Sequence, residues 1–444
     1  MRDKTQPAAA WLAVAATAMT FMGAYAFLIA LSRAPVFNTL FPSQDFFRVA
    51  LITHVTLSLV IWFVAFTLFT AHYVTRDEPW ARGELIPAAG AMLGVALIIV
   101  TPFTGPARPV LNNYVPVLDR GLYFAALGIF FAFSTLGFVW RIPALIRVAT
   151  RSKAYPVIIP GALLAAAAGL VSGDLCVLLS LRELSQIPEV AGDAIFYEAL
   201  FWGGGHVMQF ANTLCVMAVW ALLSLRLPGG RAADGPAAWL IIAVTAAPVL
   251  FAPFVYFQFP ALSPENRQMF LEIKRWGLAA GPIFAGAWAL YSLKGGGSGP
   301  VRRGLALSLF LFALGGLISL TIHGSDTRVP AHYHGVIGAV TLANMTLALA
   351  VTRDAGWLKV REGWMTMQAT MYGVGQSLFA IGLFIGGLAG LPRKTFGAAQ
   401  ELDTALKYAG MGVMGIGGLM AVLGGAAFVV FMIRAFWPER GARP

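Results

Sequence analysis

Long apolar runs separated by short polar segments repeat along the whole chain. Most of them reach the roughly 20 residues that an α-helix needs to cross the hydrocarbon core of a membrane. Pro and Gly mark many of their ends, as at Pro156 and at Pro228-Gly229. The pattern predicts an all-α polytopic membrane protein. Its twelve expected transmembrane helices cover residues 9–32, 46–74, 84–103, 119–141, 156–181, 194–226, 236–259, 267–293, 303–323, 329–352, 366–390 and 404–436.

Composition supports this pattern. Of the 444 residues 58% are hydrophobic and 11% are charged, and the mean hydropathy is +0.75, which is typical of a membrane protein and excludes an ordinary soluble domain. No long hydrophilic insertion interrupts the apolar runs, so we predict a single membrane domain over residues 1–444 without a soluble domain.

The net charge of +11 lies mainly in the short loops between apolar runs. Most Lys and Arg residues fall on the side of the N-terminus, so the positive-inside rule places both termini in the cytoplasm. We therefore expect a multi-pass protein of the cell (inner) membrane, with membrane lipids rather than nucleic acid as its surroundings.

The histidines are the candidate functional residues. Of six, His54, His206, His332 and His334 fall within expected helices or at their mouths on the same side of the membrane. His332 and His334 stand two positions apart at a helix start, so their side chains project about 200° apart and cannot easily serve one metal. Each can instead serve a planar cofactor on its own side of the helix. Polar packing residues at an interface are the alternative, but intramembrane ionisable residues are costly and usually functional.

Haem fits these histidines because neutral imidazole is a common axial ligand of haem iron. A low-spin haem needs two such ligands, from different helices. The sequence contains no C-x-x-C-H motif, which excludes covalent attachment of a c-type haem.

Three segments resemble a known family: HGSDTRVPAHYHGVIG (323–338) before and into the tenth helix, GLAGLPRKTFG (387–397) after the eleventh, and GGGHVMQF (203–210) in the sixth. With twelve helices and histidines in the second, sixth and tenth, the sequence resembles the main subunit of the haem-copper oxidase superfamily over essentially its whole length. That superfamily includes cytochrome c oxidases and nitric oxide reductases.

The resemblance implies two haems. His54 and His334 would be the axial ligands of a low-spin b- or a-type haem, and His332 would be the proximal ligand of a second, high-spin haem. Arg393 and Lys394 match the two adjacent basic residues that hold haem propionates in the family.

Four further residues are candidates around the haems. Asp326 and His323 fall near the family's acidic and imidazole pair above the haems, with a spacing that differs by about one residue. Arg48 and Arg328 lie close to the histidine-bearing helix ends, where they either bind propionates or remain solvated at the interface.

The sequence departs from the family at copper. The family binds copper with the helix-six histidine and an adjacent histidine pair in helix seven, whereas this sequence has no histidine between His206 and His323. The helix-seven region reads FAPFVYFQFPALSPE (251–265), so the chain cannot assemble a copper site of three imidazoles. The oxidases' redox tyrosine, four residues after the helix-six histidine, is Phe210 here.

His206, Tyr256 and Gln258 remain the candidate catalytic residues. They would act as polar groups beside the high-spin haem, or His206 would hold an unusual metal with a neighbour such as Glu198.

Three function classes remain. The first is the haem-bearing core of a membrane respiratory oxidoreductase, which passes electrons from the low-spin haem to a small molecule at the high-spin haem. The second is a haem electron-transfer subunit between a partner and quinone or cytochrome c, without oxygen reduction. The third, a transporter or sensor, would not explain the Pro-Arg-Lys motif. A small cytochrome c or another redox subunit is the expected partner on the outer face.

Overall fold

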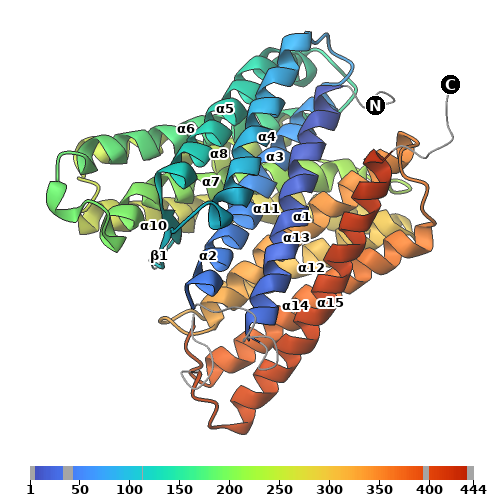
Figure 1. Ribbon diagram of the computed structural model, residues 1–444. Coiled ribbons are helices and arrows are strands. Elements are labelled where there is room, and N and C mark those ends of the chain that lie inside the picture. Colours follow the sequence, from blue (N-terminus) through green and yellow to red (C-terminus); the bar gives the residue numbers. More distant parts are fainter. Residues whose placement is uncertain (1–5, 34–43, 113, 394–399, 438–444) are drawn as a thin grey trace. The chain divides into compact units, whose positions relative to one another are not determined.

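The computed structural model describes residues 6–33, 44–112, 114–393 and 400–437. Its elements are helices apart from one short hairpin (Figure 1). The chain divides into two compact units. The first comprises Met1–Ala221 and Ala232–Ala285, and the second comprises Leu222–Arg231 and Gly286–Pro444.

The first unit holds the elements up to α10, apart from the last turn of α7, and the first part of α11, up to Ala285. They are α1 (Pro7–Arg33), α2 (Gln44–Val55), the π-helical segment η2 (Thr56–Ile61), α3 (Trp62–Val74), η3 (Arg82–Glu84), α4 (Leu85–Val100), η4 (Thr101–Phe103), β1 (Arg108–Val110), β2 (Val117–Asp119), α5 (Gly121–Thr150), α6 (Ile158–Leu184), η5 (Pro188–Val190), α7 (Ala194–Ser224), α8 (Gly235–Phe251), η6 (Ala252–Phe254), α9 (Val255–Gln258), α10 (Pro264–Gly277) and α11 (Ala280–Ser292).

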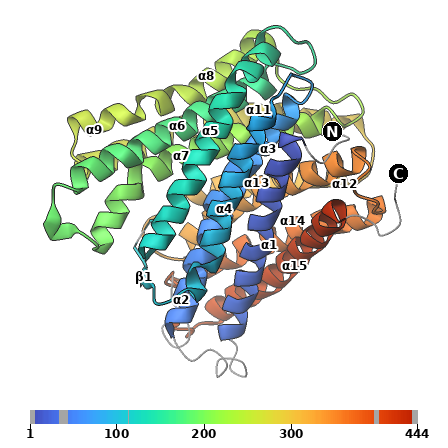
Figure 2. The same ribbon diagram turned by 45° about the horizontal axis from the view of Figure 1, so that its top comes forward.

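Neighbouring helices of this unit are also joined by polar contacts. In both views α6 lies beside α8 (Figures 1 and 2), and the Ser172 hydroxyl of α6 donates to the Val249 carbonyl over 2.6 Å. Strands β1 and β2 pair antiparallel, with Arg108 opposite Asp119.

The second unit is built from four long helices that follow the short segment η7 (Leu293–Gly295). They are α12 (Pro300–Ser319), α13 (Arg328–Asp354), α14 (Glu362–Leu388) and α15 (Ala405–Phe436). Helices α14 and α15 run side by side (Figure 1) because glycines let their backbones touch. A Cβ at Gly375 would stand 2.4 Å from the Ala421 nitrogen, and one at Gly417 would stand 2.3 Å from the Phe379 nitrogen. Small residues at contacts of this kind are typical of helix pairs in membranes.

The all-α polytopic membrane fold is confirmed. Within the described residues eleven helical segments are long and apolar enough to span a membrane. Eleven of the twelve expected helices coincide with them, and the expected helix 267–293 is divided into α10 and α11. The division has a local cause, since Pro282 has no N–H for the Leu278 carbonyl and the chain leaves the helix there. Whether residues 1–444 form a single membrane domain stays a prediction.

Candidate functional site

His54 lies in the last turn of α2, in the first unit, and is half-buried. Its Nδ1 lies 2.9 Å from the Met22 carbonyl of α1. Because a carbonyl can only accept, Nδ1 carries the proton and the lone pair of the neutral ring stands on Nε2. A haem or metal ligand needs this tautomer, fixed by a bond at the other nitrogen. The π-helical segment η2 begins two residues later, and such segments are frequent at functional sites.

His332 and His334 lie in the first two turns of α13, in the second unit. The Nδ1 of His332 lies 2.8 Å from the Gly315 carbonyl of α12, which fixes the same tautomer. The His334 ring instead packs against Phe379 of α14, with ring centroids 4.6 Å apart in an edge-to-face arrangement. The two imidazoles therefore point to different neighbouring helices, as their spacing in the sequence suggests.

The turn before α13 is joined to the segment after α14. Asp326 and Pro392 form an antiparallel bridge, and the Thr327 amide donates to the Leu391 carbonyl over 3.0 Å. The Thr327 hydroxyl also donates to the Leu383 carbonyl over 2.8 Å. These bonds hold the Pro-Arg part of the Pro-Arg-Lys motif next to the helix start that carries both histidines.

Arg393 and its neighbours take defined positions in this turn. The Nε of Arg393 donates to the Ser325 hydroxyl over 3.1 Å. The Arg328 guanidinium grips the Asp326 carboxylate, with Nη2 2.6 Å from Oδ2, and thereby holds the pKa of Asp326 below its usual range. Arg328 is thus paired within its own turn, whereas His323 is exposed.

Lys394 lies outside the described residues. Arg48 is exposed, six positions before His54 on α2. Both remain predicted partners of haem propionates.

His206 is buried in α7 and faces aromatic rings. Its Nδ1 bonds to the Trp202 carbonyl at 2.6 Å, which again leaves the lone pair on Nε2. The Tyr114 ring stacks on the imidazole, with centroids 4.6 Å apart and planes 11° apart, and the Tyr114 oxygen accepts a bond from Gln209. Lys274 of α10 is near enough for its charge to act on His206.

Tyr114 reaches this place on the loop between β1 and β2. The Asp119 carboxylate of that hairpin accepts bonds from Arg108 at 2.9 Å and from the Tyr197 hydroxyl of α7 at 2.6 Å, which ties the hairpin to the helix that carries His206. Burial alone would raise the pKa of Asp119, but these two donors hold it below its usual value. Gly205 completes the fit, since a Cβ there would stand 2.9 Å from the Tyr114 oxygen.

The other two candidate catalytic residues, Tyr256 and Gln258, separate in the structure. Tyr256 of α9 is buried against α7, where a Cβ at Gly203 would stand 2.3 Å from its oxygen. That oxygen has no hydrogen-bond partner among the described residues. Gln258 is exposed, as is Phe257. The structure thus brings Tyr256 to the helix of His206 but turns Gln258 outward.

Several neighbours of His206 lie far from it in the sequence. Arg267 of α10 donates to Glu198 over 2.7 Å and lies over the Trp202 ring, and the Trp202 indole donates to the Arg267 carbonyl. No motif in the sequence indicates that Tyr114, Arg267 or Lys274 lies near His206. Within the residues that the structure describes, no three or more His, Cys, Asp or Glu side chains gather closely enough to hold a metal ion.

Tyr114 should matter for stability in two separable ways. We expect Tyr114→Phe to lose about 1 kcal/mol of unfolding free energy with the Gln209 hydrogen bond. Tyr114→Ala should lose roughly 2 to 4 kcal/mol, because the ring that fills the space over His206 is removed. Thermal unfolding in detergent measures both, and exposed Tyr408→Ala is the control. Equal losses for the Phe and Ala variants would contradict the stacked arrangement.

Comparison with known proteins identifies the fold. No known protein-family profile matches the sequence. The chain is 27% identical to an uncharacterized protein of Aquifex aeolicus (strain VF5) over 353 residues, which are 79% of this chain and 85% of that protein. It is 24% identical to an uncharacterized protein of Rickettsia prowazekii (strain Madrid E), with 95% of this chain and 94% of that protein covered.

A solved structure is similar throughout. It is a chain of a heme-copper terminal oxidase dimer determined by cryo-electron microscopy, with a TM-score of 0.71, 17% sequence identity, and coverage of 96% of this chain and 85% of that one. The protein therefore has the fold of a haem-copper terminal oxidase subunit, in agreement with the resemblance seen in its motifs.

Proposed function

We propose that this protein is the haem-bearing subunit of a membrane respiratory oxidoreductase. His54 and His334 bind the iron of a low-spin b- or a-type haem, and His332 binds a second, high-spin haem. Bound haem supplies reversible one-electron chemistry at its iron. The protein's own part is to hold neutral imidazoles in a fixed tautomer and to exclude water from the ligands.

The observation that carries the proposal is the bond at Nδ1 of the predicted ligands. In His54 and His332 this nitrogen faces a backbone carbonyl of a neighbouring helix, at 2.9 and 2.8 Å. The bond orients the ring, makes Nε2 the electron-pair donor and raises its basicity. His334 supports the same assignment by pointing away from His332, so that the two rings of α13 serve different cofactors.

A second candidate function is electron transfer without reduction of a terminal acceptor. It is favoured by the surroundings of His206, where Tyr114 and Trp202 rings stand instead of further imidazoles. In that case electrons pass between a partner protein and quinone or cytochrome c.

Reduced-minus-oxidised spectra of the purified protein test haem binding directly. Carbon monoxide then separates the two functions, because it binds an open high-spin iron. A spectrum without haem bands after expression with sufficient haem would overturn the proposal, and haem bands without a carbon monoxide shift would favour electron transfer.

Location and partners complete the proposal. The protein spans the cell (inner) membrane with both termini in the cytoplasm, surrounded by lipid. A small cytochrome c or another redox subunit docks on the outer face, where the predicted haem ligands lie.

Arg393 is predicted to hold a haem propionate. Replacement by Gln should lower the midpoint potential of the adjacent haem by some tens of millivolts, because a nearby positive charge favours the reduced iron; for one electron, about 59 mV is a tenfold change in the redox equilibrium. Arg393→Lys should keep most of the potential, and Arg275→Gln is the control, because the Arg275 side chain of α10 is exposed. A redox titration followed by the haem spectrum makes the measurement. Unchanged potentials in the Gln variant would refute the pairing.

A further inference from the structure

One acidic side chain of the first unit stands near the middle of a membrane-spanning helix, apart from all predicted haem ligands. It is Asp174 of α6, and Thr135, near the middle of α5, donates its hydroxyl hydrogen bond to the Asp174 Oδ2 over 2.5 Å. Both side chains are half-buried. An ionisable group at this depth in a membrane is costly, so it usually pairs with another charge and serves a function.

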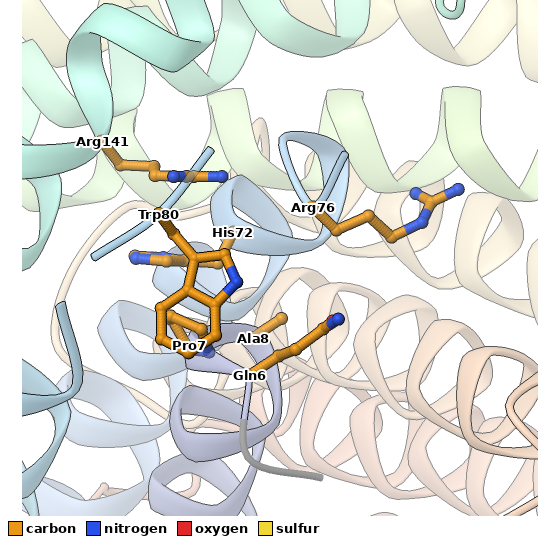
Figure 3. Close-up of a pocket in the computed structure, with 7 residues that line it drawn as sticks. All are labelled: Gln6, Pro7, Ala8, His72, Arg76, Trp80 and Arg141. Carbon is orange, nitrogen blue, oxygen red and sulfur yellow. The ribbon is translucent and has the colours of Figure 1, made fainter. Parts of the chain in front are cut away.

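Other acidic side chains of this unit are paired with arginines of the same chain. Arg141 of α5, which lines a small pocket (Figure 3), donates through Nη1 to the Glu84 Oε2 over 3.2 Å. Glu198 of α7 accepts a bond from Arg267 over 2.7 Å. Among the described residues no cation pairs with Asp174, which is bonded to a neutral hydroxyl. Its charge is therefore not compensated within the chain.

Asp174 lies at the edge of an exposed face of α6. Ser172 is bonded to α8, and Asp174, two positions later, projects about 200° away from it around the helix. The residues next to Asp174 on the helix surface are Val171, Leu175 and Leu178, with exposed fractions of 41%, 44% and 61%. The carboxylate thus stands beside apolar side chains that face the lipid or another protein.

Small residues form a stripe along α5 that leads to this carboxylate. Residues alternately four and three positions apart share one side of a helix, and on α5 they are Gly121, Ala125, Gly128, Ala132 and Thr135. The first four are exposed, and a Cβ at Gly128 would meet no described atom within 4 Å. Gly weakens a helix relative to Ala, and packing within the chain does not require the open space at Gly128. Small residues with this spacing let a second transmembrane helix approach closely.

We propose that the stripe of α5 and the adjoining face of α6 bind a transmembrane helix of a partner subunit, and that a Lys or Arg of this helix pairs with Asp174. The small residues allow the close approach, and the carboxylate selects the partner by its charge. A cation compensates the carboxylate, whereas a further hydroxyl would leave its charge in the membrane. The proposal does not depend on haem binding.

A second copy of this chain does not fit the same face. A symmetric contact offers the same surface from both copies. Residues 121–140 of α5 and 158–181 of α6 contain no Lys or Arg, so a second copy would bring another carboxylate and no cation. The charge of Asp174 therefore favours a helix from a different protein.

Photo-crosslinking of the full-length protein in the membranes of its own cells tests the site. A benzophenone amino acid in place of Leu136, which is exposed beside Thr135, should react with a membrane-spanning peptide of another protein that contains Lys or Arg. Mass spectrometry identifies this peptide, and the same probe in place of Leu240, exposed on α8, should not react with it. In Asp174→Asn the yield should fall at least about tenfold, because the cation of the partner helix loses its countercharge. Asp174→Lys, combined with Asp in place of that cation, should restore the yield.

Gly128→Leu tests the stripe without removing the carboxylate. It should lower the crosslinking yield at position 136 to a similar extent, yet it should not lower the unfolding temperature in detergent, because the space at Gly128 is open. Gly412→Leu, at an equally open glycine of α15, is the control and should leave the yield unchanged.

Reaction with lipid alone, with a second copy of this chain, or with a helix that lacks Lys and Arg would overturn the proposal. An undiminished yield in Asp174→Asn would do the same. If the Asp174 variants do not fold, Gly128→Leu decides the question, since an unchanged yield in that variant would refute docking on the stripe.

Discussion

The low-spin haem signal should disappear from both His54→Ala and His334→Ala. Six-coordinate low-spin iron needs two strong axial ligands, so loss of either imidazole leaves a five-coordinate or water-ligated, high-spin iron. The expected effect is complete loss of the low-spin bands from the reduced-minus-oxidised spectrum, measured at equal protein concentration. The high-spin haem predicted at His332 should persist in both variants.

His72→Gln is a matched control for His54→Ala. Both histidines lie in the helical stretch from α2 to α3, and both bond a backbone carbonyl through Nδ1, at 2.9 Å in each case. Only His54 is a predicted ligand, so His72→Gln should retain the low-spin bands. Unchanged low-spin bands in both alanine variants would show that the assignment is wrong.

The positions of the transmembrane helices could be predicted from the sequence because every membrane span must meet the same physical requirements. Each must be apolar and about 20 residues long, and runs such as 46–74 and 404–436 meet it without ambiguity. The hydropathy pattern does not predict the break between α10 and α11, because Pro282, which lacks an N–H, lies within a continuous apolar run. Hydropathy reports on side chains, whereas this break results from a missing backbone hydrogen bond.

The site could be predicted in part, for a similar reason. The different directions of His332 and His334 follow from helix geometry, which a sequence carries in its spacing. The sequence does not predict that Tyr114 stacks on His206, because Tyr114 lies on a hairpin loop 92 positions earlier in the chain. Gly205 can be explained only once that ring is in place. Contacts between distant segments leave no periodic trace in a single sequence.

The surroundings of His206 also bear on copper. Copper prefers imidazole and soft ligands in a defined geometry, and one histidine cannot replace three. Gln258, which stands where the helix-seven histidines would be, is exposed, and the ring stacked on His206 belongs to Tyr114. Glu198, the carboxylate that could join His206 to hold iron, already accepts a bond from Arg267 over 2.7 Å.

We therefore expect no stoichiometric copper in the purified protein and slow or absent reduction of oxygen to water. Without a second metal beside the high-spin haem, the four electrons that oxygen requires cannot be delivered from two adjacent centres. Elemental analysis against haem content and oxygen uptake with a reduced cytochrome c measure the two expectations. In His206→Gln neither value should change, because we expect the imidazole to bind no metal. One copper per chain, or rapid oxygen uptake that His206→Gln abolishes, would refute this prediction and make His206 part of a metal centre assembled from ligands other than the histidine pair.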